Sequence, residues 1–181
     1  MWSSETNTKV WRAAGMTRRA AVLALIGSVA ACGFTPVYGP QGGGTALVNA
    51  IDLPEPSDDS QYVFNRRFEE RMGRGGGAAP YRLTTRIQID DQDIGATSAG
   101  SVTRVRLIGR VFFTLTDTAT GEVVRDARTN AFTGYSTTGA TVATSAAQRD
   151  AQERLMILLA DQVIDDLVLH VSNVPTAGST P

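Results

Sequence analysis

The stretch that decides the fold is Arg104-Val-Arg-Leu-Ile-Gly-Arg-Val-Phe-Phe-Thr-Leu115. Its apolar residues recur at every second position, the period of a β-strand that buries one face. The buried face is predicted to carry Val105, Leu107, Val111, Phe113 and Leu115, with Gly109 among them. The other face carries Arg104, Arg106, Ile108, Arg110 and Phe112. A sheet with one apolar face has to be covered by a second layer.

Further strands are expected on both sides of this one. Residues 81–89 alternate in the same way, and Asp90-Asp91-Gln92-Asp93 is expected to open a polar connection. After a turn at residues 117–121, residues 122–135 are predicted to pair back as a less regular strand. A weakly alternating segment, residues 45–53, is predicted to be the first strand.

Two amphipathic helices supply the covering layer. Ser57-Asp58-Asp59 offers an N-cap, and Phe64, Phe68 and Met72 follow at four-residue spacing. A second helix of about 25 residues is predicted from the capping box at residues 145–148, with an apolar stripe through Leu155 and Leu159. The predicted fold class is therefore α+β. It is a two-layer sandwich of order β-α-β-β-β-α, with two helices packed on one face of a four-stranded mixed sheet.

The chain holds a single cysteine, Cys32, at the end of an apolar run that follows Arg18 and Arg19. A positive start, an apolar stretch of about a dozen residues and a small-residue cleavage zone are typical of a signal peptide, and the run is too short to span a membrane. Val29-Ala-Ala-Cys32 resembles a bacterial lipobox, which predicts lipidation of Cys32. A buried core cysteine and a catalytic nucleophile are the alternatives.

These features divide the chain into four expected segments. Residues 1–31 are the signal peptide, with Met16 as an alternative start. Residues 32–44 are the lipidated N-terminus and a glycine-rich spacer. Residues 45–171 form a single folded domain, and residues 172–181 form a disordered tail rich in Pro, Thr, Ser and Gly.

Composition restricts the chemistry of the mature chain, residues 32–181. It has 13 arginines, no lysine and 17 acidic residues, so its net charge is about −4 and nucleic acid is not an expected partner. A Ser-His-Asp triad would need His170, the single histidine, which is also explained as a solvated residue at the end of a helix. Zinc ligands are missing. We predict no enzyme, no cofactor and no metal site.

Two segments resemble the LptE family of lipopolysaccharide-assembly lipoproteins, also called RlpB. Cys32-Gly-Phe-Thr-Pro-Val-Tyr-Gly39 resembles the start of mature family members, with departures at Thr35 and Val37. Asp150-Ala-Gln-Glu-Arg154 and Leu159-Ala-Asp-Gln-Val163 resemble the family's terminal helix. The resemblance implies an outer-membrane lipoprotein, lipid-anchored and periplasm-facing, that plugs and supports the LptD β-barrel in lipopolysaccharide transport to the outer leaflet. Gly33, directly after the cysteine, agrees with delivery to the outer membrane.

The arginines of the exposed strand face are candidate contacts for lipopolysaccharide. Arg104, Arg106 and Arg110, with Arg82 and Arg86 beside them, could donate to the phosphates of lipid A. The alternative is an ordinary solvated face whose arginines pair with Asp126 and other acids. Residues 136–144 are a candidate loop for contact with the barrel. Two other functions stay open: a complex-assembly scaffold without lipopolysaccharide contact, and an anchored hydrolase that uses His170.

Overall fold

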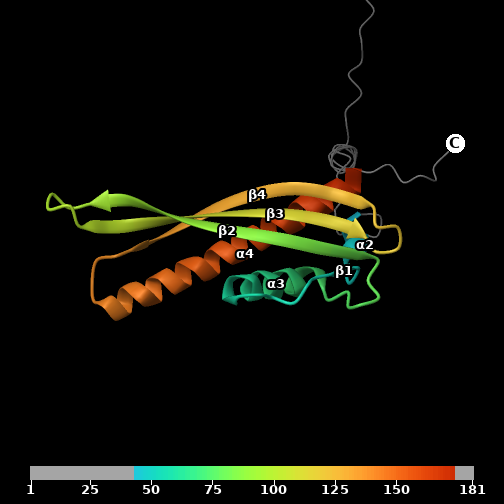
Figure 1. Ribbon diagram of the computed structural model, residues 1–181, viewed down its shortest axis with the longest axis horizontal. Helices are drawn as coiled ribbons and strands as arrows, with labels where there is room; N and C mark the ends of the chain where they lie inside the picture. Colours follow the sequence, from blue (N-terminus) through green and yellow to red (C-terminus); the bar gives the residue numbers. More distant parts are fainter. Residues whose placement is uncertain (1–42, 174–181) are drawn as a thin grey trace, which may run out of the picture. The chain divides into compact units, whose positions relative to one another are not determined.

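Three long antiparallel strands and two helices dominate the computed structural model, which describes residues 43–173 (Figure 1). The elements, in chain order, are α2 (Gly43–Leu47), β1 (Ile51–Asp52), α3 (Asp59–Met72), β2 (Tyr81–Ala96), β3 (Val102–Asp117), β4 (Val123–Ser136) and α4 (Thr141–Asn173). The sheet order is β1-β2-β3-β4, with β1 parallel to β2 and the other pairs antiparallel.

Helices α3 and α4 lie on the same side of the sheet (Figure 1). This arrangement confirms the predicted α+β fold with two helices on one face of a four-stranded mixed sheet. The inward side chains of β3 are buried as the alternation predicted, and they pack with the apolar stripe of α4 in one core. Leu107, Val111, Leu155, Leu159 and Val163 are completely inaccessible to solvent.

Gly109 permits the close approach of α4 to β3. A Cβ atom at this position would lie 2.7 Å from Leu159 Cδ1 and 3.1 Å from Leu155 Cδ2. The absence of a side chain therefore leaves room for two leucines of the helix. The glycine in the deciding strand is a packing requirement of the two-layer fold.

Helix α3 begins and ends as its sequence predicted. The Asp58 carboxylate accepts a hydrogen bond from the Gln61 amide at 2.9 Å, and Gly73 ends the helix with a φ of 74°. Phe64 and Phe68 are fully buried and stacked, with their ring centroids 6.4 Å apart. The four-residue spacing of these rings holds α3 against the rest of the core.

The predicted first strand is largely wrong. Residues 43–47 form the short helix α2, and only Ile51 and Asp52 pair with β2. Asn49, between them, has a φ of 58°, which interrupts an extended backbone. Leu47 and Ile51 are both buried, so four-residue spacing and not alternation describes this segment.

Two predicted boundaries are also wrong. Residues 90–93 belong to β2 and do not open a loop, because this part of the hairpin is exposed on both faces and tolerates carboxylates. Helix α4 begins at Thr141, one turn before the predicted capping box. The Ser145 hydroxyl donates to the Thr141 carbonyl at 3.0 Å, so it bonds back within the helix instead of capping it.

Cys32 and the predicted signal peptide lie outside the described residues. Within residues 43–173, no helix combines the length and the apolar character that crossing a bilayer would require.

Candidate interaction surface on the sheet

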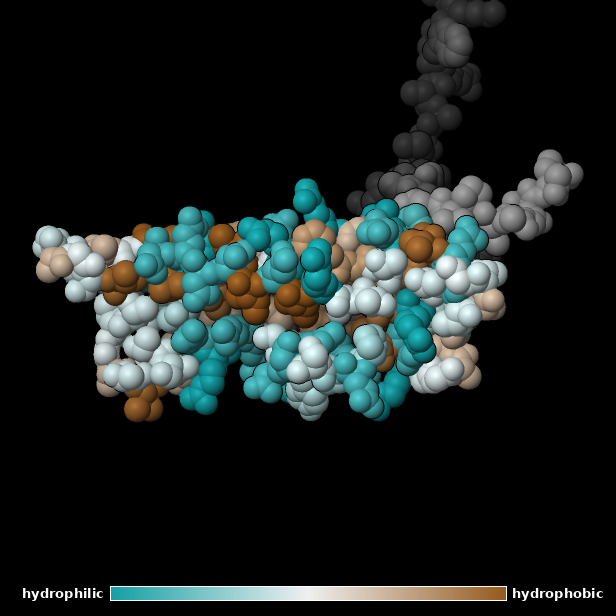
Figure 2. All heavy atoms as spheres, viewed as in Figure 1, coloured by the Kyte–Doolittle hydropathy of each residue, from teal (hydrophilic) through white to brown (hydrophobic). Residues whose placement is uncertain are grey.

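The sheet surface turned away from the helices is built by alternate residues of three strands. We call it the outer face. It carries the even-numbered residues of β2 from Arg82 to Gln92, of β3 from Arg104 to Thr116 and of β4 from Asp126 to Ser136. In Figure 2, hydrophobic and hydrophilic residues are intermixed over the strand layer, and on the outer face Ile108, Phe112 and Phe132 lie among the arginines. The outer face is therefore neither a purely polar surface nor a second apolar core.

The strand register brings arginines next to aromatic rings. Phe112 lies between Arg86 on β2 and Arg128 on β4, and the Arg86 guanidinium carbon lies 4.6 Å from the ring centroid. The Arg106 guanidinium carbon lies 5.5 Å from the ring centroid of Phe132. Each ring face attracts a cation and keeps the guanidinium extended along the sheet.

The three predicted contact residues share the outer face but differ in their charge partners. Arg110 Nη1 lies 2.6 Å from Asp90 Oδ2, so its charge is compensated. Arg110 therefore pairs with a carboxylate of the same face, as the alternative interpretation expected. Its partner is Asp90 and not Asp126, which lies opposite Thr114 on β3. In the described part of the chain, Arg104 and Arg106 have no carboxylate oxygen within 4.0 Å.

The charge balance of the outer face is positive. Six arginines point outward from β2, β3 and β4, against two aspartates, Asp90 and Asp126, so the face carries a net charge of about +4. Arg82 is compensated by Asp52 on β1 at 3.3 Å. Among residues 43–173, no carboxylate forms an ion pair with the other four arginines of this face, Arg86, Arg104, Arg106 and Arg128. This local excess contrasts with the net charge of about −4 that residues 32–181 carry together.

A hollow of about 380 Å³ lies at one end of the outer face. Ile94, Arg104, Arg106 and Phe132 contribute to its lining. Tyr135 also lines it; burial raises the pKa of this phenol, and the carboxylates of Asp91 and Asp93 raise it further. Guanidinium donors beside apolar surface can bind an anionic group that is joined to an apolar one.

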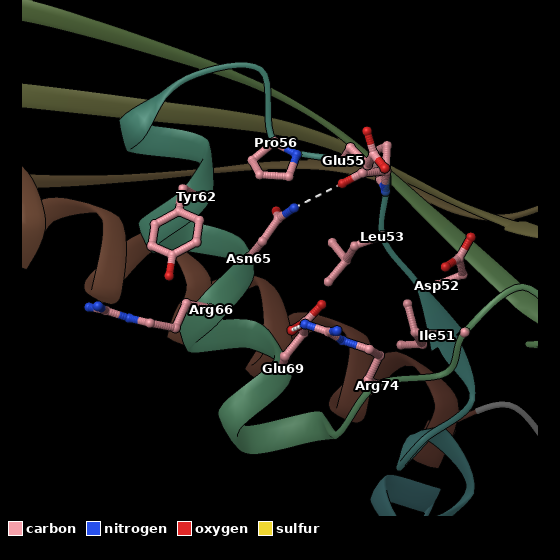
Figure 3. A pocket seen from close by; sticks show the side chains of 12 residues that line it. Ile51, Asp52, Leu53, Glu55, Pro56, Tyr62, Asn65, Arg66, Glu69 and Arg74 are labelled. Carbon is pink, nitrogen blue, oxygen red and sulfur yellow. Dashed lines mark hydrogen bonds and ion pairs between the residues drawn. The ribbon is translucent and has the colours of Figure 1, made fainter.

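A second hollow, of about 320 Å³, lies between α3 and the connection that follows β1 (Figure 3). Asn65 Nδ2 donates to the Pro54 carbonyl at 2.9 Å, as the dashed line in Figure 3 shows. Arg74 and Glu69 form an ion pair across the rim. The Nδ2 group of Asn65 fastens the proline-rich connection to α3, while the buried Oδ1 of the same amide has no hydrogen-bond partner within residues 43–173.

Part of the outer face escaped the sequence analysis. Arg128 and Phe132 were not selected, because residues 122–135 alternate poorly and the register of this strand was unknown. Arg128, Asn130 and Phe132 stand at alternate positions of the sequence, and this spacing indicates that they share one face of a strand. His170 lies half-buried in the last turn of α4.

The fold defines a class of α+β domains in which two helices cover one face of a four-stranded mixed sheet. A family model described as "LptE: Lipopolysaccharide-assembly" matches residues 48–167, and the chain belongs to this family. No curated protein matches the sequence.

Solved structures show the same fold. A putative lipoprotein from Caulobacter crescentus is 23% identical, with a TM-score of 0.58 over 72% of this chain and 97% of that one. The rare lipoprotein B from Shewanella oneidensis is 14% identical, with a TM-score of 0.53 over 66% and 92%. At these identities the likeness concerns the fold alone.

Proposed function

We propose that this chain is a lipid-anchored outer-membrane subunit that plugs and supports an LptD-type β-barrel during lipopolysaccharide transport and assembly. Membership of the LptE family supports the assembly role. The lipobox-like segment that ends at Cys32 supports the anchor. A multiply acylated cysteine attaches a domain durably, since each buried methylene contributes about 0.8 kcal/mol. The subunit acts by binding, not by catalysis.

We further propose that the outer face contacts lipopolysaccharide. The observation that carries this proposal is the pair Arg104 and Arg106, which lack carboxylate partners in the described chain and border the exposed ring of Phe132. Lipid A presents phosphates joined to acyl chains. A guanidinium can donate two hydrogen bonds to one phosphate, and the neighbouring apolar side chains can cover the start of an acyl chain.

The test uses the full-length lipoprotein purified from outer membranes in mild detergent. The double variant Arg104→Glu/Arg106→Glu is expected to bind lipopolysaccharide about tenfold more weakly or worse, since charged hydrogen bonds contribute about 1.5–3 kcal/mol each. Arg74→Glu/Arg149→Glu is the matched control, because it also reverses two charges, at exposed positions outside the outer face. A large β-barrel protein is expected to copurify with all three forms.

Different results would contradict different parts of the proposal. Equal lipopolysaccharide binding by the double variant and the control would remove the outer face as the contact. Copurification of other proteins without a barrel would refute the plug role and favour a complex-assembly scaffold.

A further inference from the structure

The outer edge of β4 is open near Gly134. Within residues 43–173, β4 pairs with β3 alone and is the last strand of the sheet. The Thr137 amide donates to the Thr103 carbonyl at 3.1 Å, which fixes which backbone groups point toward β3. Because these groups alternate, the amides and carbonyls of Phe132, Gly134 and Ser136 point to the open edge. Arg154 Nη2, at 3.4 Å from the Gly134 carbonyl, approaches from that side.

Two hollows flank this edge segment. The one on the outer face, of about 380 Å³, and another of about 400 Å³ on the α4 side both include Thr133 and Gly134 in their linings. Ile157 and Leu158 of α4 form the apolar part of the second hollow. The backbone of residues 132–136 is thus a ridge with an open depression on each side.

Large apolar side chains around the ridge are left in solvent. Phe132 is 66% exposed, Leu158 43% and Ile94 43%. Natural sheets protect such edges with charged side chains, prolines or bulges. The segment Ala131-Phe-Thr-Gly-Tyr-Ser136 has no charge and no proline, and its pairing with β3 is regular throughout. An edge of this kind is expected to be covered in the working protein.

The charges around the ridge indicate the character of the covering group. Arg104 and Arg106 line the outer hollow and Arg154 lines the other, and no acidic side chain lines either of them in the described structure. Arg154 is partly compensated by Asp150 at 3.2 Å, whereas Arg104 and Arg106 are not compensated. The surface therefore complements a segment that carries carboxylates together with apolar side chains.

We propose that residues 132–136 of β4 accept an extended strand from a protein partner, which pairs with the open edge. Alternate side chains of that strand would lie over the two hollows, with apolar groups against Phe132 and Leu158 and a carboxylate toward Arg154, so that Arg104 and Arg106 stay available to lipopolysaccharide. A strand is favoured over a lipid because it also pairs with the edge amides and carbonyls of Phe132 and Ser136, which an acyl chain leaves unpaired, and can replace the long Arg154 contact at the Gly134 carbonyl. This inference rests on the proposed function, under which the β-barrel subunit supplies the strand.

Site-specific photo-crosslinking tests the inference in bacteria that express the full-length lipoprotein. Benzoylphenylalanine is placed at position 132 or 158, and at Tyr62 on α3 as a control that is similarly exposed, at 56%. Positions 132 and 158 are expected to crosslink to the barrel protein, and position 62 is not. A barrel that copurifies while positions 132 and 158 crosslink to lipopolysaccharide alone, or to nothing, would overturn the inference and leave the proposed function intact.

Truncation gives an independent measurement. Phe132→Ala/Leu158→Ala is expected to weaken barrel association at least about fivefold, whereas Tyr62→Ala/Val123→Ala, which also shortens two exposed apolar side chains, leaves it unchanged. Unaltered thermal unfolding would show that both double variants are folded. Equal barrel association of the two would contradict the inference. If the unmodified protein carries no barrel, the proposed function fails and this inference fails with it.

Discussion

Arg67 of α3 and Asp161 of α4 form a bidentate salt bridge that joins the two helices. Arg67 Nε lies 2.9 Å from Asp161 Oδ1, and Nη2 lies 3.1 Å from Oδ2. Arg71 Nη1 donates to the same Oδ1 at 3.0 Å, so one carboxylate holds two arginines of the neighbouring helix. This carboxylate sits on the helix that also covers the sheet, and it therefore ties α3 into the two-layer fold.

Replacement of Asp161 should destabilise the protein. Asp161→Asn removes the charge shared by Arg67 and Arg71 and leaves two guanidinium groups close together, at an expected cost of about 1–3 kcal/mol. Urea unfolding measures the change. Asp165→Asn is the control, because Asp165 is more exposed and makes a single contact of 3.4 Å with Arg71. Equal losses in the two variants would contradict the special role of Asp161.

The contribution of Asp161 to the free energy of unfolding should depend on pH. Burial alone raises the pKa of this carboxyl, but the hydrogen bonds from Arg67 and Arg71 outweigh it and hold the pKa below 3.8. A carboxyl with a lowered pKa in the folded state stabilises the fold above its unfolded pKa and loses that effect as pH falls through the folded pKa. The difference in unfolding free energy between the wild type and Asp161→Asn should therefore be constant from pH 5 to 7 and shrink below pH 4. A constant difference down to pH 2 would refute this.

A larger side chain at Gly109 should disturb the contact between β3 and α4. Gly109→Val places methyl groups where Leu159 and Leu155 lie, and the expected loss of stability is about 1–3 kcal/mol. Gly77→Val is the control, since a Cβ there meets no atom within 4 Å. Thermal unfolding of both variants gives the comparison. A loss at position 77 as large as that at 109 would show that the effect comes from the backbone and not from packing.

The arginines of the outer face should differ in their effect on lipopolysaccharide binding. Arg106→Ala should weaken binding several-fold, because Arg106 has no carboxylate partner in the described structure. Arg110→Ala should have a smaller effect, because the Arg110 guanidinium is already held by Asp90. Binding isotherms with purified lipopolysaccharide measure both. A larger loss of lipopolysaccharide binding in Arg110→Ala than in Arg106→Ala would contradict this prediction and would mean that a ligand readily displaces Asp90 from Arg110.

Replacement of Cys32 tests the anchor. Cys32→Ala should abolish incorporation of radiolabelled palmitate and release the protein from the membrane fraction, because no thiol remains for lipid attachment. Cell fractionation and labelling give the measurement. Retained labelling in the variant would rule out Cys32 as the lipidated residue.

The sequence predicted the elements whose periodicity is set by burial. Alternation in β3 and four-residue spacing in α3 and α4 were clear, because each of these elements has one face in the core. Residues 90–93 and 43–47 were misassigned for the opposite reason. Where β2 is exposed on both faces, its side chains carry no period, and a five-residue helix is too short to show one.

The candidate surface was predictable only within one strand. Arg104, Arg106 and Arg110 follow from the parity of β3, but their neighbours depend on register. Ile108 of β3 is paired with Asp90 on β2 and with Phe132 on β4. No local pattern in residues 122–135 determines this strand register. The open edge of β4 likewise follows from strand order, which is a property of the assembled sheet.

The alternation along β3 makes this strand far more sensitive to its length than to its composition. Each outward arginine can be exchanged without touching the core. One inserted residue, however, would turn every side chain beyond it to the opposite side of the sheet, arginines toward Leu155 and Leu159 and leucines into solvent. Mutational scans that include single-codon insertions should therefore find that β3 tolerates substitution at alternate positions but does not tolerate the insertion or deletion of one residue.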